Sequence, residues 1–189
     1  MSSEEKPRRL RADAERNRTR LLEAGRAAFG SGREPVTLEQ VARDAGVGIG
    51  TLYRHFPTRE ALVEALYRDE VAQLCASAEV LLAAEGPARA LRRWMDRFAD
   101  YATTKREMAD SLRMLFSTGA VAISEVRKEF TAAVQTILDA GTVDGTLRTD
   151  VRAEDVVVSV VGMASATAIN GGQEQLNRMF DLLMDGIRR

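Results

Sequence analysis

The residues best suited to catalysis are few in this sequence, and their spacing does not fit an active site. The chain has one histidine, His55, and one cysteine, Cys75, which stand 20 residues apart. Pairs of carboxylates such as Asp144 and Asp150 fall in a turn-rich stretch, and there is no glycine-rich phosphate loop. Hydrolytic and metal-dependent enzymes need a nucleophile with its base, or a cluster of metal ligands. The sequence therefore predicts no enzyme activity, no metal site and no cofactor.

A second group of residues, between Gly48 and Arg59, has the chemistry to contact nucleic acid. If the segment from Ile49 to Phe56 is a helix, Ile49, Leu52 and Phe56 share one side and should be buried. Small residues, hydrogen-bonding groups and cations then face outward, which suits close approach to a duplex: Gly50, Thr51, Tyr53, Arg54 and His55. The spacing by itself also fits an ordinary helical hairpin inside a bundle.

The elements that would position this group are two short helices joined by a tight turn. Thr37 precedes Leu38, Glu39 and Gln40 in a capping-box pattern, in which the threonine hydroxyl accepts the Gln40 amide. Residues 46–48 break the first helix, and Pro57 ends the second. Two helices joined by a glycine-containing turn form a helix-turn-helix unit, whose second helix enters the major groove.

The rest of the chain also has helical periodicity, so the predicted fold class is all-α. A first helix should begin at about Asp13 and end at residues 30–32. Thr58 is the expected cap of a long helix that reaches about Ala84. Further helices are predicted at 88–103, 106–117, 122–140, 153–169 and 173–188, with turn-rich segments at 141–148 and 170–172.

Residues 36–62 closely resemble the DNA-binding signature of the TetR family of transcriptional regulators. The similarity extends back through residues 17–25 and Phe29, so it covers about the first third of the chain. It implies a TetR-like architecture, with an N-terminal arm and three-helix DNA-binding domain at 1–58. The helical remainder, 59–189, would bind a ligand and form a homodimer. The implied function is a repressor released from a palindromic DNA operator by a small-molecule effector.

The resemblance also implies roles for individual residues. Thr37, Tyr53, His55 and Arg59 would contact phosphates, and Arg59 stands where the family usually has lysine. Base contacts would come from Gly50, Thr51 and Arg54, with Ile49 available for a thymine methyl group. Gly48 completes the predicted DNA-binding set. The arginine-rich start, from Arg8 to Arg20, is either a DNA-contacting arm or a solubilising tail.

Two further sets follow from the same resemblance. The last two helices are apolar enough to pack against a second subunit, although a purely internal core would give the same pattern. The predicted interface residues are Val157, Val161, Met163, Ala164, Leu176, Phe180 and Leu183. An aromatic-rich set in the middle helices would line an effector pocket or simply form core: Trp94, Phe98, Tyr101, Met108, Leu112, Phe116 and Phe130.

Composition agrees with a nucleic-acid partner at one end of the chain. The formal net charge is −1, but residues 1–59 hold 12 Lys and Arg against 8 Asp and Glu, whereas the remainder holds 15 against 20. The single cysteine, the polar N-terminus and the lack of a long apolar run predict a cytoplasmic protein without a membrane partner. The competing hypothesis is a ligand-binding or adaptor protein with a non-functional helix-turn-helix.

Overall fold

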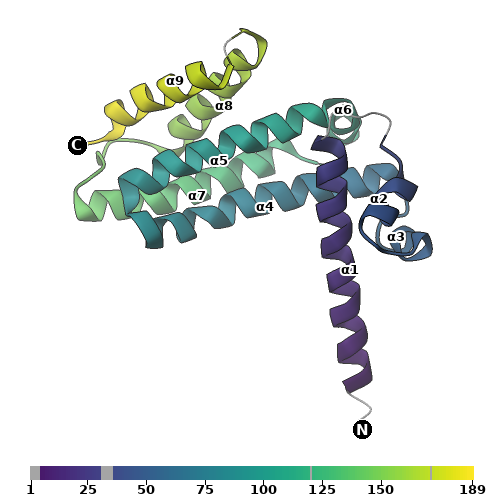
Figure 1. Cartoon of the computed structure of the whole chain (residues 1–189). Helices are drawn as coiled ribbons and strands as arrows, with labels where there is room; N and C mark the ends of the chain where they lie inside the picture. The colour runs from purple at the N-terminus through teal and green to yellow at the C-terminus, as the bar shows by residue number, and fades with distance from the viewer. Residues whose placement is uncertain (1–4, 31–35, 120, 171) are drawn as a thin grey trace. The chain divides into compact units, whose positions relative to one another are not determined.

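The structure, a computed structural model, describes residues 5–30, 36–119, 121–170 and 172–189, and these are almost entirely helical (Figure 1). Its helices are α1 (Glu5–Gly30), α2 (Leu38–Asp44), α3 (Ile49–His55), α4 (Arg59–Glu85), α5 (Pro87–Glu107), α6 (Ala109–Ser117), α7 (Ile123–Asp144), α8 (Ala153–Asn170) and α9 (Gly172–Ile187). Within this part of the chain the β-structure is one isolated bridge between Leu147 and Arg188. The all-α prediction is confirmed.

The helices form two compact units. Unit 1 contains the residues up to Asp69 together with Thr104–Val121, and unit 2 contains Glu70–Thr103 and Ala122–Arg189. Both α4 and α5 therefore contribute residues to both units. The predicted domain boundary between residues 58 and 59 stays a prediction.

In unit 1, local signals fix α2 and α3 where the sequence predicts them. The Thr37 hydroxyl accepts a hydrogen bond from the Gln40 amide at 3.2 Å, and Gly46 turns the chain with φ 64°. The α2 and α3 helices pack against each other and against α1 (Figure 1). Leu52 and Phe56 are buried in this packing, but Ile49 is 41% exposed. The expectation that Ile49 is buried was wrong, because this first residue of α3 lies at the outer edge of the packed face.

Contacts between distant helices hold the rest of unit 1 together. The Thr58 hydroxyl caps α4 by accepting the Ala61 amide at 3.1 Å, as predicted. Arg26 on α1 pairs with Asp69 on α4 at 2.7 Å. The Lys105 ammonium lies 5.3 Å from the ring centroid of Phe116 and 5.9 Å from that of Tyr67. Burial removes part of the hydration of the Lys105 ammonium group and lowers its pKa. The faces of the two aromatic rings hold this group in place.

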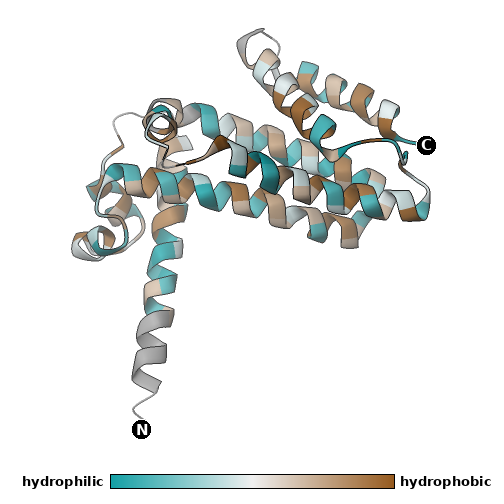
Figure 2. Ribbon diagram, turned by 180° about the vertical axis from the view of Figure 1, so that it is seen from behind, coloured by the Kyte–Doolittle hydropathy of each residue, from teal (hydrophilic) through white to brown (hydrophobic). Residues whose placement is uncertain are grey.

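Unit 2 packs α7 against α8 and α8 against α9, and apolar residues recur along its helices (Figure 2). Arg92 on α5 anchors α9, since it hydrogen-bonds Asp181 at 2.8 Å, also pairs with Asp96, and lies 5.6 Å from the Phe180 ring centroid. The chain end pairs with the connection between α7 and α8: the Arg148 amide donates to the Ile187 carbonyl at 3.0 Å. These contacts fix the C-terminal helices within the unit.

Several predicted boundaries were wrong. The α1 helix begins at Glu5 instead of about Asp13, and α5 continues to Glu107 instead of ending near residue 103. The predicted loop at 141–148 is half helical, because α7 continues to Asp144 and ends at Gly145, which has φ 77°. Three predicted features lie outside the described residues: the end of α1 at residues 31 and 32, the side chains of Arg8, Arg9 and Arg11, and position 171. None of the described helices is long and apolar enough to cross a membrane.

Candidate nucleic-acid interface

The outward face of α3 carries most of the residues predicted to contact DNA. Tyr53 is 44% exposed, Arg54 and Gly50 are exposed, and Thr51 and His55 are half-buried. A Cβ atom at Gly50 would meet no atom within 4 Å, so internal packing does not require a glycine there. The open space leaves the α3 backbone accessible to a large partner such as a duplex.

The start of α2 lies beside this face of α3. The Tyr53 hydroxyl donates a hydrogen bond to the Glu39 carboxylate, with 3.2 Å between Oη and Oε1. This bond and the negative charge of Glu39 raise the pKa of Tyr53 above its ordinary value. Because Thr37 stands two residues before Glu39, the contact brings two predicted phosphate ligands, Thr37 and Tyr53, to the same edge of the unit.

The chemistry of Thr37 is compatible with both of its assigned roles. Its oxygen accepts the capping bond from the Gln40 amide, which leaves the hydroxyl hydrogen to donate to another acceptor. Thr37 is exposed, and a phosphate oxygen is such an acceptor.

The other predicted phosphate ligands are partly engaged with the protein. The Arg59 guanidinium lies 5.2 Å from the Phe29 ring centroid, and its Nε donates to the Val36 carbonyl at 3.4 Å. The His55 ring lies against Phe56, with 6.1 Å between centroids. The Arg18 guanidinium on α1 lies 5.4 Å from the same Phe56 ring centroid. The Arg18 cation of α1 thus lies beside the residue that follows α3, whereas the Arg59 cation of α4 lies beside the C-terminal end of α1.

Comparison with known proteins agrees with this arrangement. The model of bacterial regulatory proteins of the tetR family matches residues 21–66. A second model, the C-terminal domain of SbtR-like transcriptional regulators, matches residues 86–189, which is more than half of the chain. The chain belongs to the TetR family. Its members are transcriptional regulators, and this protein is a DNA-binding regulator with a helix-turn-helix.

Individual relatives support the family assignment. The TetR regulator SCO0520 from Streptomyces coelicolor is 43% identical, covers 90% of this chain and 98% of its own, and superposes with a TM-score of 0.80. A TetR regulator from Mycobacterium vanbaalenii is 35% identical over 95% of this chain and 99% of its own, with a TM-score of 0.74. An HTH-type regulator of Staphylococcus aureus is 39% identical over 54 residues, 28% of this chain and 29% of its own length.

The residues predicted to line an effector pocket in this TetR-family protein fall into both units. Trp94, Phe98, Tyr101 and Phe130 belong to unit 2, whereas Met108, Leu112 and Phe116 belong to unit 1. The four residues of unit 2 are buried and lie against one another, with ring centroids 5.4–6.1 Å apart. The Trp94 indole donates to the Leu74 carbonyl at 3.2 Å. This aromatic cluster joins α4, α5 and α7.

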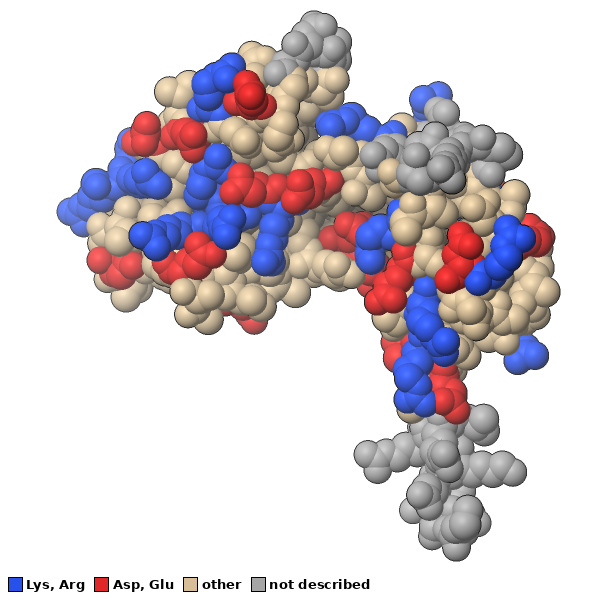
Figure 3. Space-filling model, viewed as in Figure 1, with Lys and Arg blue, Asp and Glu red and all other residues tan. Residues whose placement is uncertain are grey.

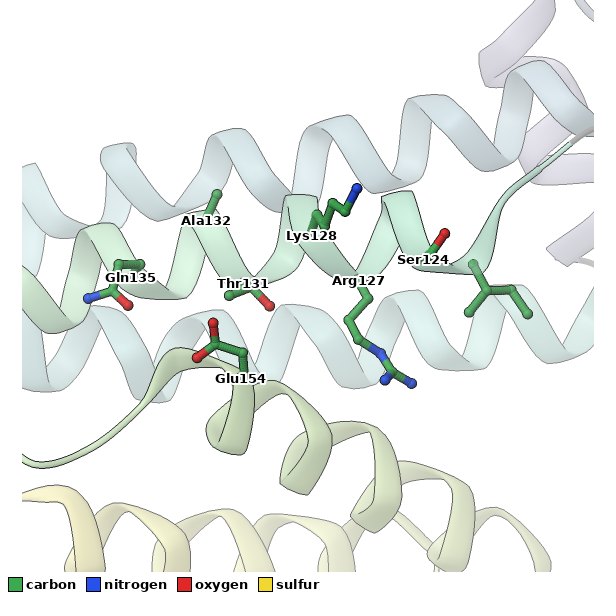
Figure 4. A pocket seen from close by; sticks show the side chains of 8 residues that line it. Ser124, Arg127, Lys128, Thr131, Ala132, Gln135 and Glu154 are labelled. Atoms are coloured by element: carbon green, nitrogen blue, oxygen red, sulfur yellow. The ribbon is translucent and has the colours of Figure 1, made fainter.

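Unit 2 also has a groove of about 690 Å³ that the sequence did not predict. Figure 4 shows it along the outer face of α7, with Glu154 of α8 directed toward Thr131. The lining combines two cations, a carboxylate, an amide, two hydroxyls and two apolar side chains: Ile123, Ser124, Arg127, Lys128, Thr131, Ala132, Gln135 and Glu154. The helical spacing of 124, 127, 131 and 135 was the available signal, but a polar stripe on a helix normally indicates solvent exposure alone.

The predicted dimer residues divide into buried and exposed positions. The side chains that are at most 5% exposed within the single chain are Val157, Ala164, Leu176 and Phe180. Their assignment to a dimer interface stays a prediction. Met163 and Leu183 are half-buried, and Val161 is 39% exposed. Among the described side chains of these two helices, the large apolar ones that are exposed are Val158 at 53%, Val161 and Leu182 at 72%.

Charged side chains elsewhere on unit 2 form a mixed surface. Basic and acidic groups are interspersed over the face seen in Figure 3. Ion pairs of unit 2 include Arg93 with Glu85 at 3.4 Å and Arg148 with Asp150 at 2.7 Å. Since neighbouring charges of opposite sign cancel, this face does not have the single-sign field of a phosphate-binding surface.

Proposed function

We propose that the protein is a homodimeric repressor that binds a palindromic operator and releases it when a small-molecule effector binds. The observation that carries the DNA-binding part is the joint placement of Thr37 and Tyr53 at one edge of unit 1. Around them, exposed small and cationic groups of α3 offer a surface that a major groove can accept.

The contacts divide into two classes. One class donates hydrogen bonds to phosphates and sets the affinity: Thr37, Tyr53, His55 and Arg59. The other class faces the base edges: Thr51, Arg54 and the exposed Ile49. The exposure of Ile49 supports this division, because an apolar side chain left in solvent next to Gly50 is available to a thymine methyl group.

The dimer forms through the outward stripe of α8 and α9. Four residues of α8 recur at helical spacing and are exposed or small: Val158, Val161, Gly162 and Ser165. A second helix can therefore approach this stripe closely. Leu182 adds a large exposed apolar side chain on α9. A two-fold pair also supplies the second recognition helix, which specific binding needs because a single α3 covers too few base pairs.

The effector acts on unit 2, where the aromatic cluster joins α4 to α5 and α7. A ligand changes operator affinity only through a difference in its affinity for the DNA-competent and DNA-incompetent states. A coupling of about 1–3 kcal/mol is sufficient for a several-fold to hundred-fold change. Compounds that raise the thermal stability of the protein should therefore change its affinity for operator DNA, and operator DNA should change their affinity by the same factor.

The decisive experiment is selection of bound fragments from genomic DNA, followed by sequencing and measurement of affinity against salt. A dyad-symmetric site should be enriched, and log affinity should fall by about 0.9 per phosphate contact for each unit of log salt. Tyr53→Phe should weaken binding to all sequences alike, whereas Thr51→Ala should change the preferred sequence. Failure to enrich any symmetric site would refute the proposal.

A further inference from the structure

The hydrogen bond between Tyr53 and Glu39 poses a problem for DNA binding. A phenol has one hydrogen to donate, and in the free protein this hydrogen points to the Glu39 carboxylate. A phosphate oxygen can take it only if the bond to Glu39 breaks. Both acceptors are anionic, and Glu39 and Tyr53 are both exposed, so a phosphate that approaches this edge competes with Glu39 for the same donor.

We propose that Glu39 is a positioning residue that competes with phosphate for the Tyr53 hydroxyl and thereby lowers the affinity of the protein for all DNA. This inference rests on the proposed contact between Tyr53 and a phosphate. It concerns Glu39, which lies in the first turn of α2 and was not part of the predicted DNA-binding set.

Glu39 acts through two effects of the same sign. The first is exchange: the bond to the Glu39 carboxylate is lost before the new one forms, which reduces the net gain from the Tyr53 hydroxyl. The second is repulsion. If Tyr53 keeps its position, the Glu39 carboxylate remains within 3.2 Å of the Tyr53 oxygen. It then lies roughly 6 Å or less from the phosphate oxygen on the other side, given a bond of about 2.8 Å.

The size of the repulsion follows from Coulomb's law. Two like unit charges about 6 Å apart weaken binding roughly threefold in bulk water and about a hundredfold at an effective dielectric constant of 20. Glu39 is exposed, so the effect per half-site should lie near the lower limit. Because the phosphate backbone is the same for every sequence, operator and unrelated DNA should be affected equally.

Glu39→Gln tests the proposal because it removes the charge but keeps an acceptor of the same shape. Operator and non-operator DNA should each bind about 3–10 times more tightly per half-site. In the free protein, the pKa of Tyr53, followed by NMR of ring-labelled tyrosine, should fall toward its ordinary value. Glu23→Gln is the matched control, since it removes one exposed carboxylate from α1 of the same unit and should have a smaller effect.

A double-mutant cycle separates competition from a general charge effect. Tyr53→Phe should cost more affinity in the Glu39→Gln background than in the wild type, because the neutral amide oxygen of the variant holds the hydroxyl less strongly than the carboxylate does. Equal costs in both backgrounds would overturn the proposal, as would weaker binding by Glu39→Gln. A changed preference at a single base pair would instead assign Glu39 to base contact. If the wild type itself does not discriminate operator from random DNA, the proposed function fails first.

Discussion

A charge placed at Val161 should dissociate the proposed dimer while leaving the subunit folded. Val161 is 39% exposed on the outward stripe of α8, whereas Phe180 on α9 is 0% exposed. Val161→Glu therefore changes a surface that only a partner would cover, and Phe180→Glu would place a charge in the core of the subunit. The two substitutions, which the sequence treats as equivalent, should have different outcomes.

The expected magnitude follows from the exposed fraction. Complete burial of a valine side chain contributes about 1.5–3 kcal/mol, so covering the 39% of Val161 that remains exposed contributes about 1 kcal/mol per subunit. The two-fold pair loses about twice that, about 2 kcal/mol, and the hydration lost by the two unpaired glutamates adds at least as much again. A total of about 4 kcal/mol would raise the dimer dissociation constant about a thousandfold.

Sedimentation or light scattering over a range of micromolar concentrations measures this constant, and circular dichroism checks the fold. Val80→Glu is the matched control, because Val80 is a 64% exposed valine of unit 2 on α4, outside the proposed stripe. It should leave the dimer intact. Operator affinity of Val161→Glu should fall as the two recognition helices lose their link. An unchanged dimer in Val161→Glu, or an equal loss in Val80→Glu, would refute the assigned interface.

Three further predictions concern the interior. Gly141→Ala should lower stability by about 1–3 kcal/mol, because a Cβ there would come within 2.8 Å of the Leu147 Cβ atom; an unchanged melting temperature would contradict this packing. Burial, with Glu129 adding to it, raises the pKa of Cys75 from 9.0 to about 11, so its thiol should be alkylated about a hundredfold more slowly in the folded than in the unfolded protein. The pKa of Lys105 is lowered in the folded protein, so just below pH 10.5 the unfolded chain binds more protons than the folded one. The wild type should therefore gain stability relative to Lys105→Met as the pH rises into that range. A difference in unfolding free energy between the two proteins that does not change with pH would contradict this.

The helix-turn-helix could be predicted because its signals are local. Thr37 caps α2, Gly46 turns the chain and Pro57 follows α3, and each acts within a few residues of its own position. The exposure of Ile49 could not be predicted in the same way. Helical periodicity places it beside Leu52, but whether the packed face extends to the first turn depends on contacts with other helices.

The dimer face shows a second limit of periodicity. In α8 the apolar residues surround the helix, so the sequence does not distinguish the stripe that faces the subunit's own core from the stripe that faces outward. The structure assigns Val157, Val160 and Ala164 to the first stripe and Val158 and Val161 to the second. Adjacent valines thus have different roles, which only the packing of α7 and α9 against α8 determines.

Glycine was misinterpreted at one position for a related reason. Gly141 resembled a helix stop, but α7 passes through it and ends at Gly145. The lack of a side chain at Gly141 serves close packing against Leu147, a contact made only after the chain has turned. Such a role depends on the approach of a residue beyond the turn, which composition and spacing do not indicate.

The contact between Glu39 and Tyr53 joins residues on two different helices, and it bears on how a regulator of this kind responds to an effector. The loss of affinity caused by Glu39 is expected to be equal for all DNA. It therefore lowers the affinities for operator and non-specific DNA but leaves their ratio unchanged. Operator occupancy responds to a coupling of about 1–3 kcal/mol only when the dissociation constant is close to the protein concentration. If the operator were bound far more tightly, the same coupling would leave it occupied. By weakening the phosphate contact of Tyr53, Glu39 would keep the operator affinity within the range in which a modest ligand effect releases the protein.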